Sequence, residues 1–385
     1  MERKVLFTAS TYSHIAHFHR PYLRSFSRLG WTVDVACGGE PLPIPEARRV
    51  IPLPLEKSIW APANLRAERI LRRAMEAEGY DLISTHTSLA AFFTRLAARG
   101  LDTVVVNTCH GYLFDGDTPA PRRGLLLGAE KLTAGRTDLL LTMNRCDGEI
   151  ARSHRLGRRL LPIPGVGVDF SALDAVPASA RETLRAEWDI PEEAFVLIYP
   201  AEVSKRKDQE TLLRALALLP ERICLLLPGD GTLKESCESL AKELGVWGRV
   251  RFPGHVGSMG AWYRGADCAV TSSRSEGLPF NVMEAMHCGL PVVATAVKGH
   301  EDLIRQEENG LLFPFGDVEA CAQCIRRLSG DPSLAVRLGR QGRADAENYR
   351  LERVLPQVLE AYRTVVPELE ELSMIQSGRK GAEHF

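Results

Sequence analysis

The chain has 385 residues, of which 45% are hydrophobic and 25% are charged, and its formal net charge is −1 at pH 7. This is the composition of an ordinary globular protein, long enough for two domains, and the balanced charge argues against a nucleic-acid binder. The nine cysteines, an odd number, favour reduced thiols. The sequence also lacks a long apolar run and a signal-peptide pattern, which favours a cytoplasmic location.

The first half of the sequence alternates short apolar strands with helical segments. The predicted strands cover residues 5–8, 32–36, 81–84, 103–107 and 138–142, and the predicted helices cover residues 21–29, 65–77, 89–99, 125–134 and 146–154. Strands that alternate with helices at this spacing indicate βαβ units and a parallel sheet.

The pattern loosens over residues 170–192, which carry helix formers and prolines but few core residues, and it then restarts. Further strands are predicted at residues 195–199, 223–227, 250–252, 268–271, 291–294 and 310–313, with helices between them and a long helical stretch over roughly residues 332–365. We therefore expect one domain over residues 1–175, a linker at 176–192 and a second domain over 193–350. A helix at 351–370 is expected to pack back toward the first domain, and residues 371–385 are expected to form a frayed tail.

Two glutamates, Glu276 and Glu284, stand eight positions apart around a Gly-Leu-Pro turn that opens a helix. Such a turn points backbone N–H groups and the positive end of a helix at one place, which suits a diphosphate. Glu284 could then reach ribose hydroxyls, and Glu276 could reach a sugar. A helix cap and a solvated acid are the alternative, but Glu284 lies in the apolar run 282–286, where a buried carboxylate needs partners.

Three cations, Lys205, Arg206 and Lys207, follow the predicted strand 195–199 and precede a helix. At the carboxyl edge of a sheet such a cluster fits phosphate charge, and a solvated basic turn is the equally simple alternative.

Two later turns could also contribute to a ligand site. Gly229 and Gly231 could let the backbone approach a ligand, and the segment with Gly254, His255 and Val256 could hold a base by its edge and face. Taken singly, both are common loop patterns.

Histidines follow two strands of the first half. His110 and Gly111 come directly after the strand at 103–107, and His14, His17 and His19 follow the first strand. Three histidines at this spacing could bind a metal, but a polar cleft loop or helix cap is the preferred interpretation, because no acidic partner is near in sequence. The dinucleotide motif GxGxxG and the phosphate loop GxxxxGK[ST] are both absent.

These motifs resemble those of the retaining GT-B glycosyltransferases of family four over nearly the whole chain. The E-x7-E motif matches Glu276 through Glu284, residues 289–295 and 309–313 are typical of the family, and residues 13–15, 110–114 and 164–169 are similar to bacterial exopolysaccharide and capsule glycosyltransferases. The resemblance implies two Rossmann-like, doubly wound α/β domains that face each other across a cleft. The N-terminal domain would bind the acceptor and the C-terminal domain the nucleotide-sugar.

The resemblance also implies roles for individual residues. Glu276, His110 and Lys207 would be catalytic, and His14, His17, His110 and Gly111 would lie on the acceptor side. The donor would be bound by Lys205, Arg206, Lys207, Gly229, Gly231, Gly254, His255, Val256, Gly277, Leu278, Pro279, Phe280, Asn281, Val282 and Glu284. Glu202 stands where the family has an arginine, so Lys205 or Arg206 would supply the missing charge.

The implied reaction transfers a hexose or N-acetylhexosamine from a nucleotide-sugar, UDP-linked by the likeness to the subgroup, to a saccharide or a lipid-linked saccharide. Neither a cofactor nor a metal is expected, because the cations and the helix end would carry the diphosphate charge. A nucleotide-sugar epimerase of the same fold and an inactive nucleotide-sugar-binding partner remain as alternatives.

Two basic, partly apolar segments suggest peripheral contact with an anionic membrane, with ordinary solvated helices as the alternative. The first has Arg66, Arg69, Arg72 and Arg73, and the second has Arg122, Arg123, Lys131 and Arg136 beside residues 125–127.

Overall fold

The computed structural model describes residues 2–58, 60–367 and 369 and divides into two compact units. The first unit contains the residues up to Gly167 together with the described residues from Glu352 onward, and the second unit spans Val168–Leu351. The expected tail at 371–385 lies outside the described residues.

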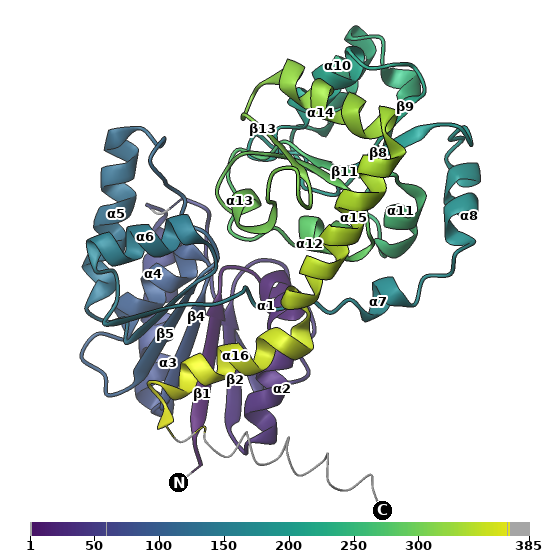
Figure 1. Ribbon diagram of the computed structural model, residues 1–385. Helices are drawn as coiled ribbons and strands as arrows, with labels where there is room; N and C mark the ends of the chain where they lie inside the picture. The colour runs from purple at the N-terminus through teal and green to yellow at the C-terminus, as the bar shows by residue number, and fades with distance from the viewer. Residues whose placement is uncertain (1, 59, 368, 370–385) are drawn as a thin grey trace, which may run out of the picture. The chain divides into compact units, whose positions relative to one another are not determined.

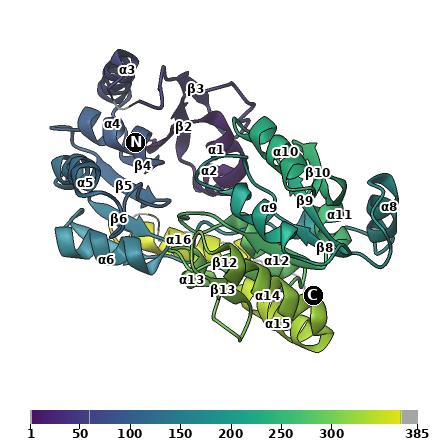
Figure 2. The same cartoon turned by 90° about the horizontal axis from the view of Figure 1, so that it is seen from above.

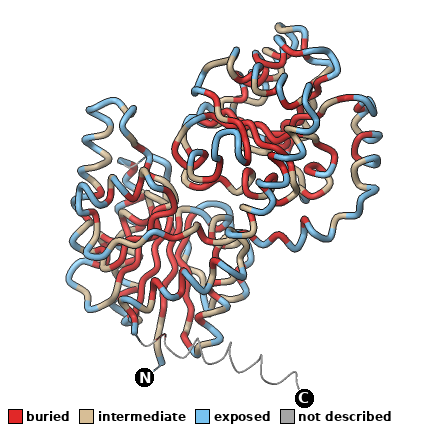
Figure 3. The backbone as a smooth tube through the Cα atoms, in the orientation of Figure 1, coloured by how far each residue is buried: buried red, intermediate tan, exposed pale blue. Residues whose placement is uncertain are grey.

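The first unit is built on a parallel seven-stranded sheet with the order β3-β2-β1-β4-β5-β6-β7 (Figure 1). The strands are β1 (Lys4–Ala9), β2 (Thr32–Cys37), β3 (Arg49–Pro52), β4 (Leu82–His86), β5 (Val104–Cys109), β6 (Leu139–Thr142) and β7 (Arg159–Pro162). Val5 of β1 pairs with Val33 on one side and Leu82 on the other, which makes β1 and β4 the central strands where the chain reverses its direction of travel. Because helices cover both faces, the inner strands β1, β2, β4, β5 and β6 are largely buried (red in Figure 3), whereas the edge strands β3 and β7 are half-buried to exposed.

Helices cover both faces of this sheet. They are α1 (Tyr12–Phe18), α2 (Arg20–Arg28), α3 (Pro62–Glu78), α4 (Ser88–Ala97), α5 (Ala120–Ala134), α6 (Arg145–His154) and α16 (Leu351–Arg363). Local signals set their ends: Pro62 occupies the first turn of α3, and Gly79 ends that helix in the left-handed conformation. Asn144 caps α6 by accepting a hydrogen bond from the backbone N–H of Asp147.

The last helix, α16, belongs to the first unit although it is far along the chain (yellow in Figure 1). The Tyr362 hydroxyl lies 2.6 Å from the Ser84 hydroxyl on β4, and its ring packs edge-on against Phe26 of α2. Arg159 of β7 donates a hydrogen bond to the carbonyl of Thr364 at 2.6 Å. The end of the chain therefore completes the core of the unit that its beginning starts.

The second unit repeats the plan with a parallel six-stranded sheet in the order β10-β9-β8-β11-β12-β13 (Figure 2). The strands are β8 (Phe195–Ile198), β9 (Ile223–Pro228), β10 (Val250–Gly254), β11 (Cys268–Thr271), β12 (Val292–Thr295) and β13 (Leu311–Phe313). The helices are α7 (Ser171–Asp174), α8 (Ala180–Glu187), α9 (Gln209–Ala217), α10 (Lys234–Glu243), α11 (Gly260–Gly265), α12 (Phe280–His287), α13 (His300–Leu303), α14 (Val318–Gly330) and α15 (Pro332–Ala346). Here β8 and β11 are the central strands where the order reverses.

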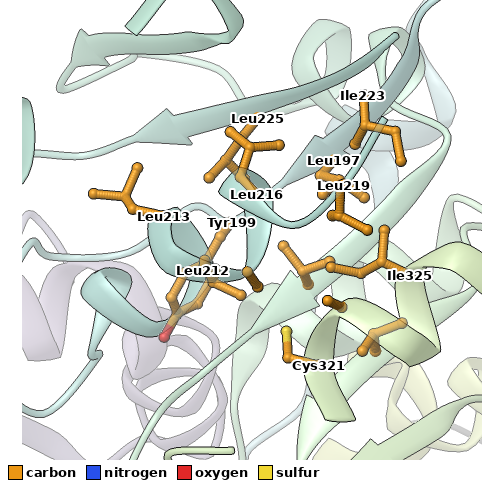
Figure 4. Packing of buried hydrophobic residues seen from close by; sticks show 14 of the residues in the cluster. Leu197, Tyr199, Leu212, Leu213, Leu216, Leu219, Ile223, Leu225, Cys321 and Ile325 are labelled. Carbon is orange, nitrogen blue, oxygen red and sulfur yellow. The ribbon is translucent and has the colours of Figure 1, made fainter. Parts of the chain in front are cut away.

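One apolar cluster forms most of the core of the second unit (Figure 4). Leu197 and Leu225 of the sheet meet Leu216 of α9 and Ile325 of α14 there, all at most 2% exposed. Cys321 of α14 is fully buried in the same cluster, so the CxxC formed with Cys324 has a packing role.

Three local features differ from the sequence-based expectation. Residues 176–192, predicted to be a linker, lie within the second unit, because Arg181 and Arg185 of α8 both pair with Asp267 at 2.6 and 2.7 Å. The predicted long helix over 332–365 is broken by a 3-10 turn at Glu347–Tyr349. The four-residue strands β3 and β7 at the sheet edges were not predicted, since such short segments carry little periodic signal.

No helix among the described residues combines the length and the hydropathy that a membrane span requires.

A buried ion pair ties α4 to α5. Arg95 is fully buried and donates to the Glu130 carboxylate at 2.9 Å, to the Ala91 carbonyl at 3.0 Å and to the Thr137 hydroxyl at 3.3 Å. The pair is expected to make the first unit sensitive to the loss of either charge.

Replacement of Glu130 by Gln should lower the free energy of unfolding of the first unit by about 3–5 kcal/mol, because the guanidinium stays buried without its counter-charge. Urea unfolding monitored by circular dichroism measures the change. The double variant Arg95→Met with Glu130→Leu removes both charges and should recover most of the stability. Equal stability of Glu130→Gln and wild type would contradict this account.

Candidate functional site

The sequence candidates of the second unit meet at the carboxyl edge of its sheet, where β8 and β11 diverge. The loop after β8 carries Lys207 and the loop after β11 carries Glu276. In open parallel sheets the connections after the two central strands run in opposite directions, and this leaves a place for a ligand at the edge.

Glu276 is the centre of a charged cluster and is only 8% exposed. Lys207 donates to one carboxylate oxygen at 2.5 Å, and Arg206 donates to the other at 2.9 Å. Ser273 donates a third hydrogen bond to the carboxylate, at 2.5 Å. The predicted cation cluster and the first glutamate of the motif are therefore in direct contact.

These contacts decide the charge state of Glu276. Burial alone would raise the pKa of the carboxyl group, but the positive charges of Lys207 and Arg206 outweigh it and hold the pKa at about 2. Burial lowers the pKa of the Lys207 ammonium, and the Glu276 charge opposes that effect. At neutral pH Glu276 is thus an ionised carboxylate whose lone pairs are already engaged by three donors.

Residues that the sequence did not single out hold this cluster in place. Tyr199, at the end of β8, lies 2.6 Å from the Ser273 hydroxyl and donates to the Lys207 carbonyl at 3.1 Å. The backbone of Gly299 lies against Glu276 so closely that a Cβ there would come within 2.9 Å of it. Each of these residues directly follows a strand or lies in a loop at the same sheet edge, and that position is the one signal that could have found them.

Glu284 is oriented by a different partner. It lies on α12, and its carboxylate accepts a hydrogen bond from Tyr263 of α11 at 2.9 Å. Burial raises its pKa to about 6, against the opposing effect of the Tyr263 bond. Glu284 is half-buried, and Tyr263 is the partner that the sequence analysis required for its carboxylate.

The turn that precedes α12 is fixed to the neighbouring strand. Pro279 occupies the N-cap position of α12 and has no side-chain group that could cap the helix. Asn281 donates to the carbonyl of Pro200, just after β8, at 3.0 Å. Leu278 is 8% exposed, and Phe280 and Val282 continue the helix start. Gly277 lies half-buried directly after Glu276.

The packing of the protein itself requires the glycines after β9. A Cβ at Gly229 would lie 2.0 Å from the carbonyl oxygen of Ala201, and one at Gly231 would lie 2.3 Å from that of Val203. The loop after β8 therefore fills the space that side chains would need. The close approach that these glycines permit is between two loops of the protein.

The remaining donor-side candidates lie at the rim of this region. Lys205, Glu202 and His255 are exposed, Val256 is half-buried and Gly254 is buried with a φ of 73°. The Glu202 charge is close enough to raise the pKa of Lys207, against the net lowering by burial. Arg206 rather than Lys205 supplies the second cation of the cluster.

In the first unit the structure brings His14 and His110 together, with their Nε2 atoms 3.4 Å apart. His19 and His86 complete a group of four imidazoles. The fourth member, His86, was not a sequence candidate, although it ends β4 at the same sheet edge. His17 is exposed and lies outside the group, because its Nδ1 is 2.7 Å from the carbonyl of Ser13 on the same helix. Gly111 follows His110 with a φ of 124°.

Comparison with known proteins identifies the family. Residues 16–165 match the glycosyl transferase 4-like domain, and residues 180–345 match the family described as glycosyl transferases group 1. EpsD of Bacillus subtilis strain 168, which is named as a glycosyltransferase, is 34% identical over 369 residues, with 94% of this chain and 97% of EpsD covered. The chain belongs to the group 1 glycosyl transferases. The prediction of a glycosyltransferase related to exopolysaccharide enzymes is confirmed.

Two further relatives extend the comparison. The D-inositol 3-phosphate glycosyltransferase of Xylanimonas cellulosilytica is 30% identical over 328 residues, with 80% of this chain and 77% of that protein covered. Among solved structures, the sucrose-phosphate synthase of Thermosynechococcus elongatus gives a TM-score of 0.79 at 23% identity, with 95% and 100% of the two chains covered. HepE of Anabaena in complex with UDP-glucose gives 0.77 at 19% identity, with 94% and 99% covered. These likenesses confirm the predicted GT-B fold with two Rossmann-like domains.

The raised pKa of Glu284 predicts how the stability of this glycosyltransferase changes with pH. The ordinary value of 4.5 rises to about 6 in the folded protein, so the group stabilises the fold below pH 4.5 and this contribution is lost as the pH rises through 6. Glu284→Gln cannot ionise. Its stability relative to wild type should therefore rise by about 2 kcal/mol between pH 4.5 and 7, as measured by urea unfolding. A difference that does not change with pH would contradict the burial of this carboxyl group.

Proposed function

We propose that this glycosyltransferase moves a hexose or an N-acetylhexosamine from a UDP-linked sugar to a saccharide or a lipid-linked saccharide during the synthesis of a surface polysaccharide. The observation that carries the proposal is the contact of Lys207 and Arg206 with Glu276 at the sheet edge. It sets two cations beside a carboxylate, the groups that a diphosphate and a sugar require. The similarity to HepE, solved with UDP-glucose, supports the choice of UDP.

Each part of the donor would contact a different group of residues at this edge. Ribose hydroxyls would donate to Glu284, which Tyr263 orients. The diphosphate would take the charge of Lys207 and Arg206 and the backbone N–H groups at the start of α12. Lys207 and Arg206 already neutralise Glu276, and a bound diphosphate would contact the same two cations. The carboxylate lone pairs that remain would then accept hydrogen bonds from the sugar hydroxyls.

The proposed reaction retains the configuration of the anomeric carbon. The bond from that carbon to the leaving phosphate oxygen breaks, the bond to the acceptor oxygen forms on the same face, and the acceptor proton passes to the departing diphosphate. Glu276 is a poor nucleophile for a covalent route, because its pKa is held at about 2 and three donors engage it. Its role is to position the sugar. The charge of the leaving group is carried by Lys207 and Arg206, so the donor step is proposed to need no metal ion.

The first test is a panel of UDP- and GDP-sugars with the full-length chain and no added metal. Release of nucleotide from a UDP-hexose or a UDP-N-acetylhexosamine, faster with an added saccharide acceptor, is the expected result. Turnover of GDP-sugars alone would overturn the choice of UDP. Nucleotide-sugar binding without any turnover would favour a binding partner over a transferase.

Lys207→Met should weaken UDP binding by about 10–100-fold, because one charge-assisted contact with the diphosphate is lost, as measured by isothermal titration calorimetry. Lys242→Met is the matched control: Lys242 lies on α10 over the ring of Trp247, at 4.8 Å, and its loss should not change UDP affinity. The double variant Lys207→Met with Glu276→Gln also removes the carboxylate that Lys207→Met leaves without its ammonium partner. It should still bind UDP poorly. Unchanged UDP affinity in Lys207→Met would contradict the proposed diphosphate site.

We also propose that the first unit docks on an anionic membrane surface, where a lipid-linked acceptor would be found. On α3, Arg66, Arg69 and Arg73 are exposed beside Leu65, which is 56% exposed. On α5, Leu125 and Leu132 are 48% and 56% exposed, seven residues apart on one side of the helix. The helix α4 packs between α3 and α5, so their exposed sides belong to one surface (Figure 2).

Two of the basic residues predicted for this surface make hydrogen bonds within the protein. Arg72 donates to the carbonyls of Ala97 and Arg99, and Arg136 donates to the carbonyl of Ala98 and to Asp138. Both therefore fasten the ends of helices, and the docking surface rests on the other cations and on the exposed leucines.

The docking surface predicts salt-sensitive co-sedimentation with vesicles that contain phosphatidylserine and none with pure phosphatidylcholine vesicles. The double variant Leu125→Glu with Leu132→Glu should lose most of the binding, because it adds negative charge and removes apolar contact. Val336→Glu, at a residue of α15 that is 70% exposed, is the matched control and should bind as wild type does. Equal sedimentation of all three proteins would rule out this surface.

A further inference from the structure

Four imidazoles converge at the carboxyl edge of the first sheet, next to the central strands β1 and β4. His14 lies on α1 after β1, His19 directly follows that helix, His86 ends β4, and His110 follows β5. One ring nitrogen from each lies within 4.8 Å of the others. The donor residues of the proposed function lie in the second unit. Within this group the resemblance implies acceptor-side or catalytic roles for His14 and His110, and it implies none for His19 and His86.

The spacing of these nitrogens fits the coordination shell of a small metal ion. Nε2 of His14 is 3.2 Å from Nε2 of His19 and 3.4 Å from Nε2 of His110, which is 3.1 Å from Nδ1 of His86. Zinc binds imidazole nitrogen at about 2.0–2.1 Å, which puts tetrahedral ligands about 3.3–3.4 Å apart. Three edges of such a tetrahedron are thus nearly formed.

Hydrogen bonds alone satisfy this arrangement poorly. A neutral imidazole nitrogen offers either one hydrogen or one lone pair, so four nitrogens in a row can form at most two undivided hydrogen bonds. The structure has three contacts in that row. A cation bound by four lone pairs would satisfy all four nitrogens at once.

The protonation state of the group suits a metal. Burial lowers the pKa of His14 to about 4 and lowers the pKa values of His19, His86 and His110 well below the ordinary value, and the neighbouring imidazoles add to the effect for the last three. All four rings are therefore neutral at pH 7, which is the form that binds metal ions. His14 and His110 are partly exposed, which leaves a path for an ion to enter.

A supporting contact orients one of the ligands. Nε2 of His86 lies 2.9 Å from the Ser84 hydroxyl, which in turn lies 2.6 Å from the Tyr362 hydroxyl. When Nε2 carries the hydrogen and donates it to Ser84, the lone pair of Nδ1 points into the group. Metal-binding histidines are commonly held by such a partner on the other ring nitrogen.

We propose that His14, His19, His86 and His110 bind one zinc ion per chain. The site fastens the segment after β1 to the ends of β4 and β5. It would also occupy Nε2 of His110, so this nitrogen could not exchange protons during sugar transfer. The proposal departs from the sequence-based expectation that the protein holds no metal, because nothing in the sequence indicates that His86 joins the other three histidines.

The test uses the untagged full-length chain after removal of metal by a chelator and dialysis. Zinc is titrated against a chromophoric competitor, bound zinc is counted by mass spectrometry, and cobalt is added as a spectroscopic probe of tetrahedral nitrogen coordination. The expected result is one zinc per chain and a tetrahedral cobalt spectrum. A wild-type chain that binds no zinc, or a cobalt spectrum of octahedral type, would overturn the proposal.

Two variants locate the site. His14→Ala, at a partly exposed ligand, should weaken zinc binding by more than about tenfold, and Ser84→Ala should weaken it by about 10–100-fold through loss of the support to His86. His17→Ala, an exposed histidine on the same helix, is the matched control. Zinc binding that survives His14→Ala or that is lost equally in His17→Ala would place the metal elsewhere. A circular dichroism spectrum and a urea unfolding curve like those of wild type would show that the first unit remains folded in each variant.

Discussion

The constraint on which both sites depend is the reversal of strand order at the centre of each parallel sheet. The chain builds outward from β1 in one direction and from β4 in the other, and it does the same from β8 and β11 in the second unit. The connections after these strands must leave the sheet in opposite directions, so the edge between them is left open to side chains. In each unit that edge is where ionisable groups gather: a carboxylate with two cations in the second, and four imidazoles in the first.

The two edges solve the problem of burying polar groups in different ways. In the second unit opposite charges meet, so Glu276 remains ionised although it is 8% exposed. The cost of taking these charges out of water is offset only because Ser273, Arg206 and Lys207 engage the carboxylate together. In the first unit no opposite charge is in contact with the imidazoles among the described contacts, and neutrality takes its place. The same sheet topology therefore produces both clusters. One is charged and can bind a phosphate, and the other is neutral and can bind a cation.

Much of this could be predicted from the residues alone. The alternation of apolar strands and helices predicts two αβ domains. The spacing of Glu276 and Glu284 around a proline turn predicts the donor-binding edge of the second sheet. The remainder depends on contacts between segments that are distant in sequence. Nothing in the sequence marks Ser273, which donates to Glu276, or Tyr199, which contacts Ser273. Likewise, His86 has no histidine near it in the sequence, although the His19 ring lies tilted against it at 3.8 Å between ring centroids. The sequence pattern predicts a linker where α8 lies, because Asp267, which pairs with this helix, lies some eighty residues later.

The position of α16 has a consequence for how the protein is made. Tyr362 and Thr364 complete the packing of a unit whose strands occupy residues up to 162, while the whole second unit is encoded between them. A ribosome delivers the chain from its N-terminus, and domains generally fold as they emerge. The second unit can thus reach its native contacts from a continuous stretch of chain. The first unit completes its packing only after α16 has left the exit tunnel, because Ser84 and Phe26 lack their partner Tyr362 until then.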